Sequence, residues 1–250
     1  DADKSSDFSR RHKSTMIIKP QSKILFIGAS VTDCGRDRTV GQNFAGATSA
    51  HATGADAENA DATNALGNGY VCFIDALLGS QPVEYSSQIV NKGISGDTSR
   101  DVRARWQRDV LDLQPDWVSL MVGVNDIWRR FDSPQQPELG VPLDEYQANI
   151  RDVVQRTRPH VEGFLLAAPF FLEPSHTDEM RVQFDLYHEV LRTIAREEDV
   201  IYVDIQAAFD AVLETRPSTA LAPDRIHPNH IGHMITARAW LEAVSFKWGK

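Results

Sequence analysis

Short apolar runs alternate with longer amphipathic stretches along this chain. Five runs, at residues 23–28, 84–91, 116–122, 163–168 and 200–203, are rich in large apolar side chains. Short apolar segments bounded by glycine or polar residues are typical of strands that are buried on both faces. The pattern therefore predicts five strands.

The stretches between these runs have helical spacing. Helices are expected at residues 70–78, 98–110, 143–158, 178–198 and 229–244. Alternation of buried strands with helices favours a parallel sheet covered on both faces. The predicted fold class is α/β, a single-domain three-layer α/β/α sandwich with a central five-stranded parallel sheet. In such sheets the active site lies beyond the carboxyl ends of the strands.

Two polar segments stand outside this pattern, and no linker divides the chain into two domains. Residues 1–15 read as a polar N-terminal extension, and residues 16–250 as one domain. Within that domain, residues 41–66 are rich in Ala, Gly, Asn, Asp and Thr and carry few large apolar side chains. This composition predicts a surface insertion.

The charge and the cysteines exclude some classes of function. The net charge is −9, from 26 basic and 35 acidic residues, which argues against nucleic acid or an anionic membrane as partner. No apolar run is long enough to span a membrane. Cys34 and Cys72 lack metal-site spacing and are expected to be reduced thiols. Residues 1–15 hold no signal-peptide core, so a cytoplasmic protein is expected, or a secreted one if a leader was removed.

Ser30 is the first candidate for chemistry. It follows the first predicted strand in Gly28-Ala29-Ser30, and a serine in a tight turn after a strand is well placed to act as a nucleophile. The alternative is an ordinary turn serine. Thr32 stands where a G-x-S-x-G elbow has its second glycine, so the motif is not that elbow.

Two further candidates follow the second and third strands. The backbone N–H of Gly93 can point at an oxyanion, although a plain glycine turn is the alternative. The side-chain amide of Asn125 can stabilise developing negative charge, or else Asn125 caps the next helix.

The last candidates are Asp224 and His227, which precede the final helix. Pro228 disfavours helical geometry at His227, so the pair is expected on a loop. There the carboxylate can orient the imidazole ring while the other ring nitrogen faces a serine as general base. The alternative is an incidental pair on a surface loop.

Taken in order, these positions resemble the SGNH (GDSL-like) hydrolases, whose blocks supply Ser, Gly, Asn and His. The segments that carry the likeness are SVTDCGR, NKGISGDTSRDVRARW, GVNDIWR, LDEYQANIR and DRIHPNHIGHMITARAWL. They are similar to a bacterial branch that includes acetylxylan esterases and many unassigned lipase-like or lysophospholipase-like proteins. The likeness covers about residues 24–248, apart from the insertion.

The resemblance implies a flavodoxin-like fold, a triad and an oxyanion hole. The triad would be Ser30, Asp224 and His227, and the oxyanion hole would be Ser30, Gly93 and Asn125. It implies no cofactor, and relatives in this branch tend to form homo-oligomers. Relatives usually read Gly-Asp-Ser in the first block, whereas this chain has Ala29 in place of the aspartate. The turn amides would then be left to water or to nearby acidic side chains.

The expected function is a serine esterase for small acyl groups. The branch points to a carbohydrate deacetylase that acts on acetylated xylan or xylo-oligosaccharides. A lysophospholipase, thioesterase or arylesterase is the alternative, and a catalytically weak binding protein is a remote one. A lipid substrate favours an apolar lid or interfacial helix. The long insertion is polar, which favours a water-soluble ester.

Residues near the candidate triad could bind substrate or a metal ion. Trp128 and Arg129 follow the Asn125 block and are candidates for substrate binding, with a rim tryptophan and a salt-bridged arginine as the alternative. His227, His230 and His233 recur every third residue, which spreads the side chains around a helix, so no metal site is expected. Asp97 and Asp126 are expected to be local caps or turn ligands.

Overall fold

The computed structural model describes residues 16–38, 65–81 and 86–247. The predicted N-terminal extension at residues 1–15 and nearly all of the predicted insertion at residues 41–66 lie outside these ranges. Both therefore stay predictions from the sequence.

A five-stranded parallel sheet forms the centre of the described part of the molecule. The strand order is β2-β1-β3-β4-β5, and each neighbouring pair is parallel. The strands are β1 Lys23–Gly28, β2 Gln88–Asn91, β3 Trp117–Met121, β4 Gly163–Ala167 and β5 Ile201–Val203. The predicted five-stranded parallel sheet is confirmed.

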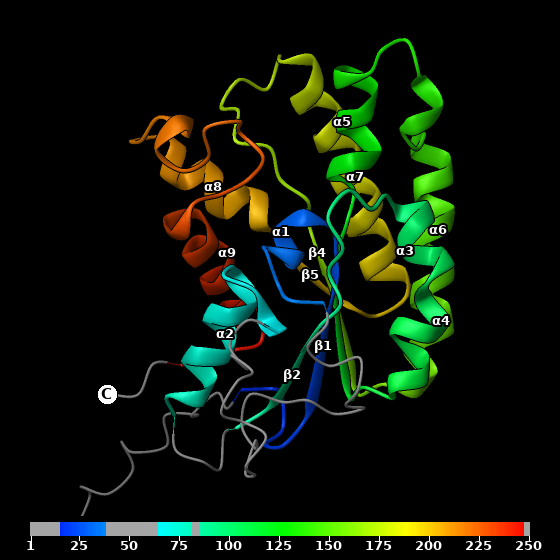
Figure 1. The fold of residues 1–250 in the computed structure, drawn as a ribbon, viewed down its shortest axis with the longest axis vertical. Coiled ribbons are helices and arrows are strands. Elements are labelled where there is room, and N and C mark those ends of the chain that lie inside the picture. Colours follow the sequence, from blue (N-terminus) through cyan, green and yellow to red (C-terminus); the bar gives the residue numbers. More distant parts are fainter. Residues whose placement is uncertain (1–15, 39–64, 82–85, 248–250) are drawn as a thin grey trace, which may run out of the picture.

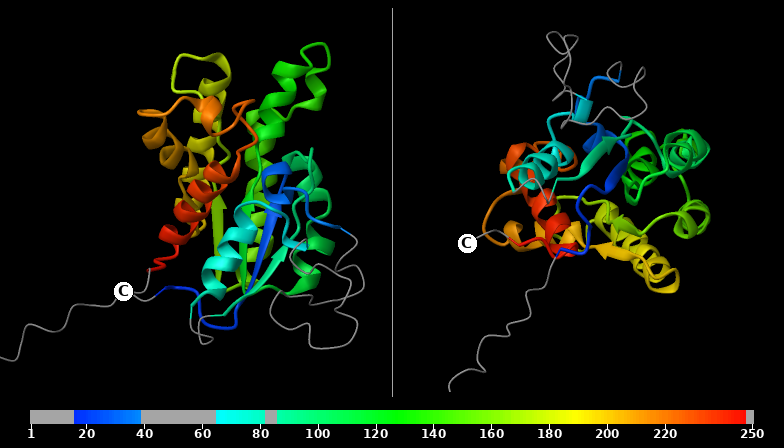
Figure 2. Two further views of the ribbon diagram at one scale, coloured as in Figure 1. Left: turned by 60° about the vertical axis from the view of Figure 1, so that its left-hand side comes forward. Right: turned by 90° about the horizontal axis from the view of Figure 1, so that it is seen from below.

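Helices cover both faces of the sheet, as Figures 1 and 2 show. One face carries α2, α8 and α9, and the other carries α3 to α7. The α-helices are α1 Ser30–Asp33, α2 Tyr70–Gly79, α3 Ser99–Ala104, α4 Trp106–Asp109, α5 Val124–Asp132, α6 Leu143–Thr157, α7 Glu179–Glu197, α8 Ile205–Leu213 and α9 His230–Ala243. Short 3-10 turns lie at η4 Leu111–Leu113, η5 Pro137–Leu139, η6 Arg158–His160 and η7 Ser218–Ala220.

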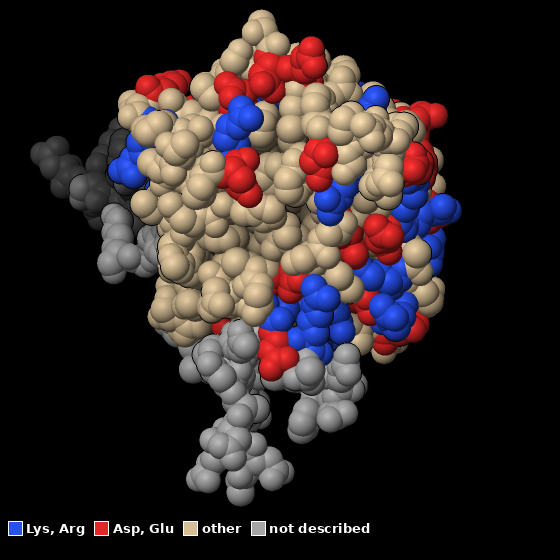
Figure 3. Space-filling model, turned by 45° about the horizontal axis from the view of Figure 1, so that its top comes forward, with Lys and Arg blue, Asp and Glu red and all other residues tan. Residues whose placement is uncertain are grey.

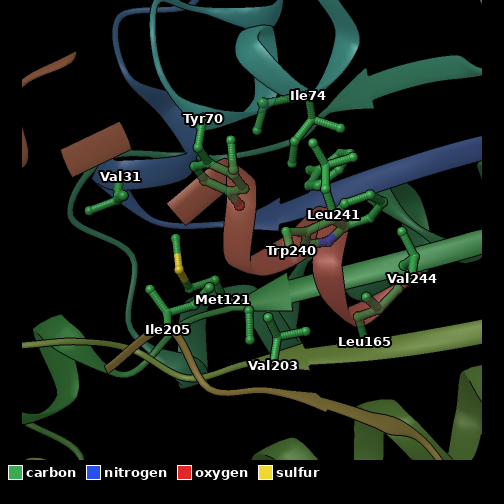
Figure 4. Close-up of a cluster of buried hydrophobic side chains, with 14 of the residues drawn as sticks. Val31, Tyr70, Ile74, Met121, Leu165, Val203, Ile205, Trp240, Leu241 and Val244 are labelled. Atoms are coloured by element: carbon green, nitrogen blue, oxygen red, sulfur yellow. The ribbon is translucent and has the colours of Figure 1, made fainter. Parts of the chain in front are cut away.

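Each strand supplies side chains to two separate cores, one on each face. Phe26 of β1 and Leu165 of β4 belong to the core under α2, α8 and α9, while the adjacent Leu25 and Leu166 belong to the opposite core. This alternation follows from the period of two in a strand. Both faces are apolar because helices bury both. Figure 4 shows Trp240 of α9 among the side chains of the first core.

The structure differs from the sequence pattern in three helical regions, and one of them, α5, follows β3 where no helix was predicted. The helix predicted at residues 98–110 is interrupted at Arg105, where α3 ends and α4 begins. A second helix, α8, was not predicted: it begins two residues after β5, so its apolar residues continue the run of that strand. Asp204 caps it by accepting the N–H of Ala207 at 3.0 Å.

The two cores each hold a buried indole whose N–H has one hydroxyl acceptor. Trp240 Nε1 donates to Ser119 Oγ at 3.0 Å, and Trp106 Nε1 donates to Thr157 Oγ1 at 2.8 Å. Both tryptophans are 0% exposed. We expect Ser119→Ala and Thr157→Val each to lower the free energy of unfolding by about 1–3 kcal/mol, because each leaves a buried donor unpaired.

Urea unfolding of the two variants and of their combination checks this prediction. The effects should add, because the pairs lie on opposite faces of the sheet and share no partner. Thr157→Ser keeps the hydroxyl and serves as the control. A Thr157→Val variant as stable as Thr157→Ser contradicts the role given to the hydrogen bond.

Candidate active site

The candidate residues converge at the carboxyl ends of β1, β2 and β3 and on the loop before α9. Ser30 is the first residue of α1, directly after β1, and Asn125 is the second residue of α5, after β3. Asp224 and His227 lie on the loop between η7 and α9. In Figure 1 these segments meet at the upper end of the sheet, near α1. The structure therefore brings the predicted triad together.

The triad forms a continuous hydrogen-bonded chain. Ser30 Oγ lies 2.9 Å from His227 Nε2, and His227 Nδ1 lies 2.6 Å from Asp224 Oδ2. An ionised carboxylate can only accept, so the ring proton sits on Nδ1 and leaves Nε2 to accept from Ser30. This is the arrangement of a nucleophile, a general base and the group that orients the base.

Asp224 is held by the backbone of its own loop as well as by the ring. Its Oδ1 accepts the N–H groups of Ile226 at 3.0 Å and His227 at 2.8 Å. Burial acts to raise the pKa of Asp224, but these hydrogen bonds and the bond from the His227 side chain outweigh it, so the pKa lies below its usual value. Asp224 therefore stays ionised, as its orienting role requires.

The loop that carries this pair is tied to the β4–α7 connection through Arg225. Arg225 has a φ of 64°, unusual for a residue with a side chain. Its carbonyl accepts the N–H of Leu172 at 2.9 Å, and its guanidinium binds Glu173 Oε2 at 2.7 Å and lies over the Phe171 ring. These contacts fix the loop from both backbone and side chain.

The prediction that the N–H of Gly93 faces the oxyanion is corrected by the structure. That N–H is buried and donates to Asn91 Oδ1 at 2.8 Å. A Cβ at Gly93 would lie 2.3 Å from the backbone nitrogen of Asp33, so the position needs glycine for close packing against α1. Gly93 thus sets the distance between this loop and α1, and its amide is already occupied.

Gly96 supplies the amide that Gly93 does not. In the described structure the N–H groups of Gly93, Ile94, Ser95 and Asp97 all have acceptors, whereas that of Gly96 has none. Gly96 is exposed, with a φ of 91°, a conformation that favours glycine. Gly96 is visible in the sequence as the second glycine of the segment. The spacing of the residues alone could not show whether Gly93 or Gly96 has the free N–H.

Asn125 lies beside this free amide. Its Nδ2 donates to the carbonyl of Asp97 at 2.8 Å, and the side chain amide has a second proton that this bond does not use. The N–H of Ser30, at the start of α1, also has no acceptor among the residues described. Three donors, from Ser30, Gly96 and Asn125, are therefore available at this end of the sheet.

The loop that contains Gly96 is also bound to α1. Asp33 Oδ2 accepts both the N–H of Ser95 at 2.9 Å and its hydroxyl at 2.8 Å. Burial acts to raise the pKa of Asp33, but hydrogen bonds from Arg38 and Ser95 prevail and lower it. Asp33 thus links α1 to the glycine loop, whereas Ala29 has no carboxylate to offer.

Trp128 lies next to the triad and Arg129 does not contact it. The Trp128 ring meets the His227 ring edge-on, with 6.0 Å between centroids. Arg129 lies over the Trp128 ring, 5.5 Å from its centroid, and pairs with Asp132 at 3.0 Å. Trp128 is therefore placed to line the site, and Arg129 contacts the Trp128 ring and not the triad.

The other histidines have structural partners. His233 is buried, accepts the N–H of Tyr70 on Nδ1 at 3.2 Å and lies 3.3 Å from Cys34 Sγ. Burial lowers the pKa of His233 to about 4, so the ring is neutral. His230 lies beside Phe73. Within residues 16–38, 65–81 and 86–247, no three His, Cys, Asp or Glu side chains gather as a metal site would need.

The Asp126 carboxylate binds the start of another helix, and the Asp97 carboxylate forms an ion pair, so Asp97 is not the local cap or turn ligand that was predicted. Both carboxylate oxygens of Asp126 lie 3.0 Å from the N–H of Ser99, which joins the start of α5 to the start of α3. Asp97 pairs with Arg105 at 2.7 Å. Burial raises the pKa of Asp126 to about 6.

This raised pKa predicts a pH dependence of stability. The ordinary value for Asp126 is 3.8, so between about pH 6 and pH 4 the folded chain binds a proton that the unfolded chain does not. The contribution of Asp126 to the free energy of unfolding should therefore rise as the pH falls through 6. Because one pKa unit corresponds to about 1.4 kcal/mol, the gain should be on the order of 1–3 kcal/mol.

Urea unfolding at pH 7 and pH 4.5 of the wild type and of Asp126→Asn measures this gain. Asparagine is uncharged at both values, so the difference between the two proteins isolates Asp126 from the other carboxylates. An equal response of both proteins to pH contradicts the prediction.

The face that holds the triad carries no large area of one charge. Figure 3 shows most of it as uncharged residues, with acidic and basic side chains close to one another. The surface therefore suits a neutral or mixed substrate better than a polyanion.

No helix in the described part of the chain has the length and apolar character to cross a membrane.

A hydrogen-bonded chain of serine, histidine and aspartate on an α/β sandwich is the arrangement found in serine hydrolases. Residues 26–235 match the GDSL-like Lipase/Acylhydrolase family. The chain belongs to this family, and the predicted resemblance to SGNH (GDSL-like) hydrolases is confirmed.

Similar proteins are known. An acetylxylan esterase from Geobacillus stearothermophilus is 45% identical over 233 residues, covering 93% of this chain and 98% of the relative. The crystal structure of Axe2, an acetylxylan esterase from that organism, superposes with a TM-score of 0.83 at 44% identity, over 94% of this chain and 99% of Axe2. The crystal structure of LAE5, an alpha/beta hydrolase enzyme from the metagenome of Lake Arreo, Spain, superposes with a TM-score of 0.83 at 39% identity. The match covers 92% of this chain and 98% of LAE5. Axe2 structures also include catalytic mutants in which a serine, an aspartate or a histidine is replaced by alanine.

Proposed function

We propose that this protein is a serine esterase that removes acetyl groups from acetylated xylan or xylo-oligosaccharides. The observation that carries the proposal is the hydrogen-bonded chain from Ser30 through His227 to Asp224. The likeness to acetylxylan esterases along nearly the whole chain supports the choice of substrate.

In the proposed reaction Ser30 Oγ attacks the ester carbonyl while His227 Nε2 takes its proton. Asp224 keeps the ring in the required tautomer and stabilises the imidazolium. The tetrahedral oxyanion lies among the N–H groups of Ser30 and Gly96 and the side-chain amide of Asn125. His227 then returns the proton to the leaving alcohol, and water attacks the acyl-enzyme with the same histidine as base.

Exposure of the site favours a small acyl group on a large, water-soluble alcohol. The side chains of His227 and Asp224 are 43% and 46% exposed, so the triad opens directly to solvent. Trp128 offers an aromatic surface beside His227, suited to the apolar face of a sugar ring. A homo-oligomeric assembly and a cytoplasmic location stay predictions from the sequence.

A hydrolysis panel tests the substrate class. We expect purified protein to release acetate from acetylated xylo-oligosaccharides and to cleave p-nitrophenyl acetate faster than the butyrate or octanoate. Ser30→Ala should abolish all of these activities. A preference for octanoate points instead to a lysophospholipase or other lipid-type esterase, and lack of Ser30-dependent turnover on every substrate contradicts the proposal.

The role of Asn125 is tested by its own variant. We expect Asn125→Ala to lower kcat by about 10²–10³, because one oxyanion donor is lost. KM on p-nitrophenyl acetate should change little, since the donor acts in the transition state, and the melting temperature should fall only modestly, through loss of the bond to the carbonyl of Asp97. Steady-state kinetics and thermal unfolding check both points. A variant with wild-type kcat would show that the amide does not face the reacting carbonyl.

A further inference from the structure

The interruption between α3 and α4 places one arginine in an unusual position. Val102 and Trp106 are buried against the sheet on either side of the break, and Arg105 has φ and ψ of −96° and 4°. A continuous helix was expected here because Val102, Trp106 and Val110 have helical spacing. The break is therefore a departure from the local pattern, and it falls at Arg105.

Arg105 makes four hydrogen bonds at once, and its side chain is only 9% exposed. Its Nε donates to Asp97 Oδ2 at 2.7 Å, and its Nη1 donates to the carbonyl of Lys92 at 2.8 Å and to Asp109 Oδ2 at 3.0 Å. Its Nη2 donates to the carbonyl of Gly28 at 3.2 Å. A guanidinium has five N–H donors in a fixed plane, and this site uses four of them.

Three of the four acceptors belong to the segments that carry the oxyanion donors, and the fourth, Asp109, lies at the end of α4. Gly28 is two residues before Ser30, in the turn that holds the nucleophile. Lys92 and Asp97 bracket the loop that holds Gly96, and the carbonyl of Asp97 also accepts from Asn125. One planar group thus fixes the nucleophile turn and the glycine loop relative to each other.

We propose that Arg105 is the positioning residue that sets the geometry of the oxyanion hole. This inference rests on the proposed esterase function. Arg105 does not touch the triad: it acts through the carbonyls of Gly28 and Lys92 and the carboxylate of Asp97. Lysine cannot replace it, because a single ammonium cannot serve four acceptors arranged in the plane of a guanidinium.

The neighbouring arginine provides a matched control. Arg108 lies on α4, pairs with the same Asp109 at 2.8 Å and is 73% exposed. Among the residues that the structure describes, Arg108 donates hydrogen bonds only to Asp109. Substitution of Arg108 removes the bonds to Asp109 without removing a bond to either active-site loop, so Arg108→Lys and Arg108→Ala should keep wild-type activity.

The test compares Arg105→Lys and Arg105→Ala with these controls. The measurements are kcat and KM on p-nitrophenyl acetate, the rate of Ser30 labelling by a fluorophosphonate, and the melting temperature. Displacement of catalytic groups by about 1 Å can cost about 10² in rate, so we expect kcat and labelling of the Arg105 variants to fall about 10- to 100-fold. KM should change far less, because the ground-state carbonyl does not need the oxyanion donors.

Two further measurements distinguish positioning from general support of the fold. The acidic limb of the pH–rate profile should not move, because Arg105 contacts neither Asp224 nor His227. Guanidinium chloride at millimolar concentration should restore part of the activity of Arg105→Ala, whereas sodium chloride should not.

The outcomes separate this inference from the function on which it rests. If the folded Arg105→Lys variant keeps wild-type kcat and labelling, or if activity is lost only in proportion to unfolded protein, the positioning role is overturned. If the wild type itself neither cleaves any ester nor reacts with the fluorophosphonate, the proposed function fails instead.

Discussion

The hydrogen bond between Ser30 and His227 joins residues 197 positions apart in the chain, and the rest of the structure determines whether it can form. The parallel sheet brings the strand that precedes Ser30 into the centre, between β2 and β3. Helix α9 packs beside α2 and α8 on one face, which brings the loop before it over the end of β1. The 2.9 Å contact between Ser30 and His227 therefore depends on the packing of the whole α/β/α sandwich.

Arginine side chains bind backbone carbonyls and carboxylates of the segments at this end of the sheet. Arg36 binds the carbonyl of Gly93 at 2.9 Å, Arg105 binds those of Gly28 and Lys92, and the Arg225 side chain binds Glu173. Each of these contacts fixes a loop that has no regular secondary structure of its own. The glycine loop therefore has a defined conformation even though Ala29 stands where relatives usually have an aspartate.

The sequence was sufficient for the sheet because its strands have local signals, whereas the triad was predicted from the resemblance to a family. Apolar runs identify buried strands, and chemistry-bearing residues follow them. The choice between Gly93 and Gly96 required the structure, since it depends on whether Asn91 has already taken the amide. The interruption at Arg105 could also be found only in the structure. The periodicity of a sequence shows which residues are apolar, but it does not show which acceptors a guanidinium contacts.

The order of the strands and the place of the catalytic base have a consequence for folding. The proposed nucleophile, Ser30, lies near the start of the described chain, whereas the proposed base, His227, lies just before the last helix. Contacts between such distant positions carry a high loop-closure cost and form late. A chain still emerging from the ribosome would hold Ser30 but lack His227, so it would be inert toward esters. Reactivity of the serine is therefore also a measure of completed synthesis and docking of α9.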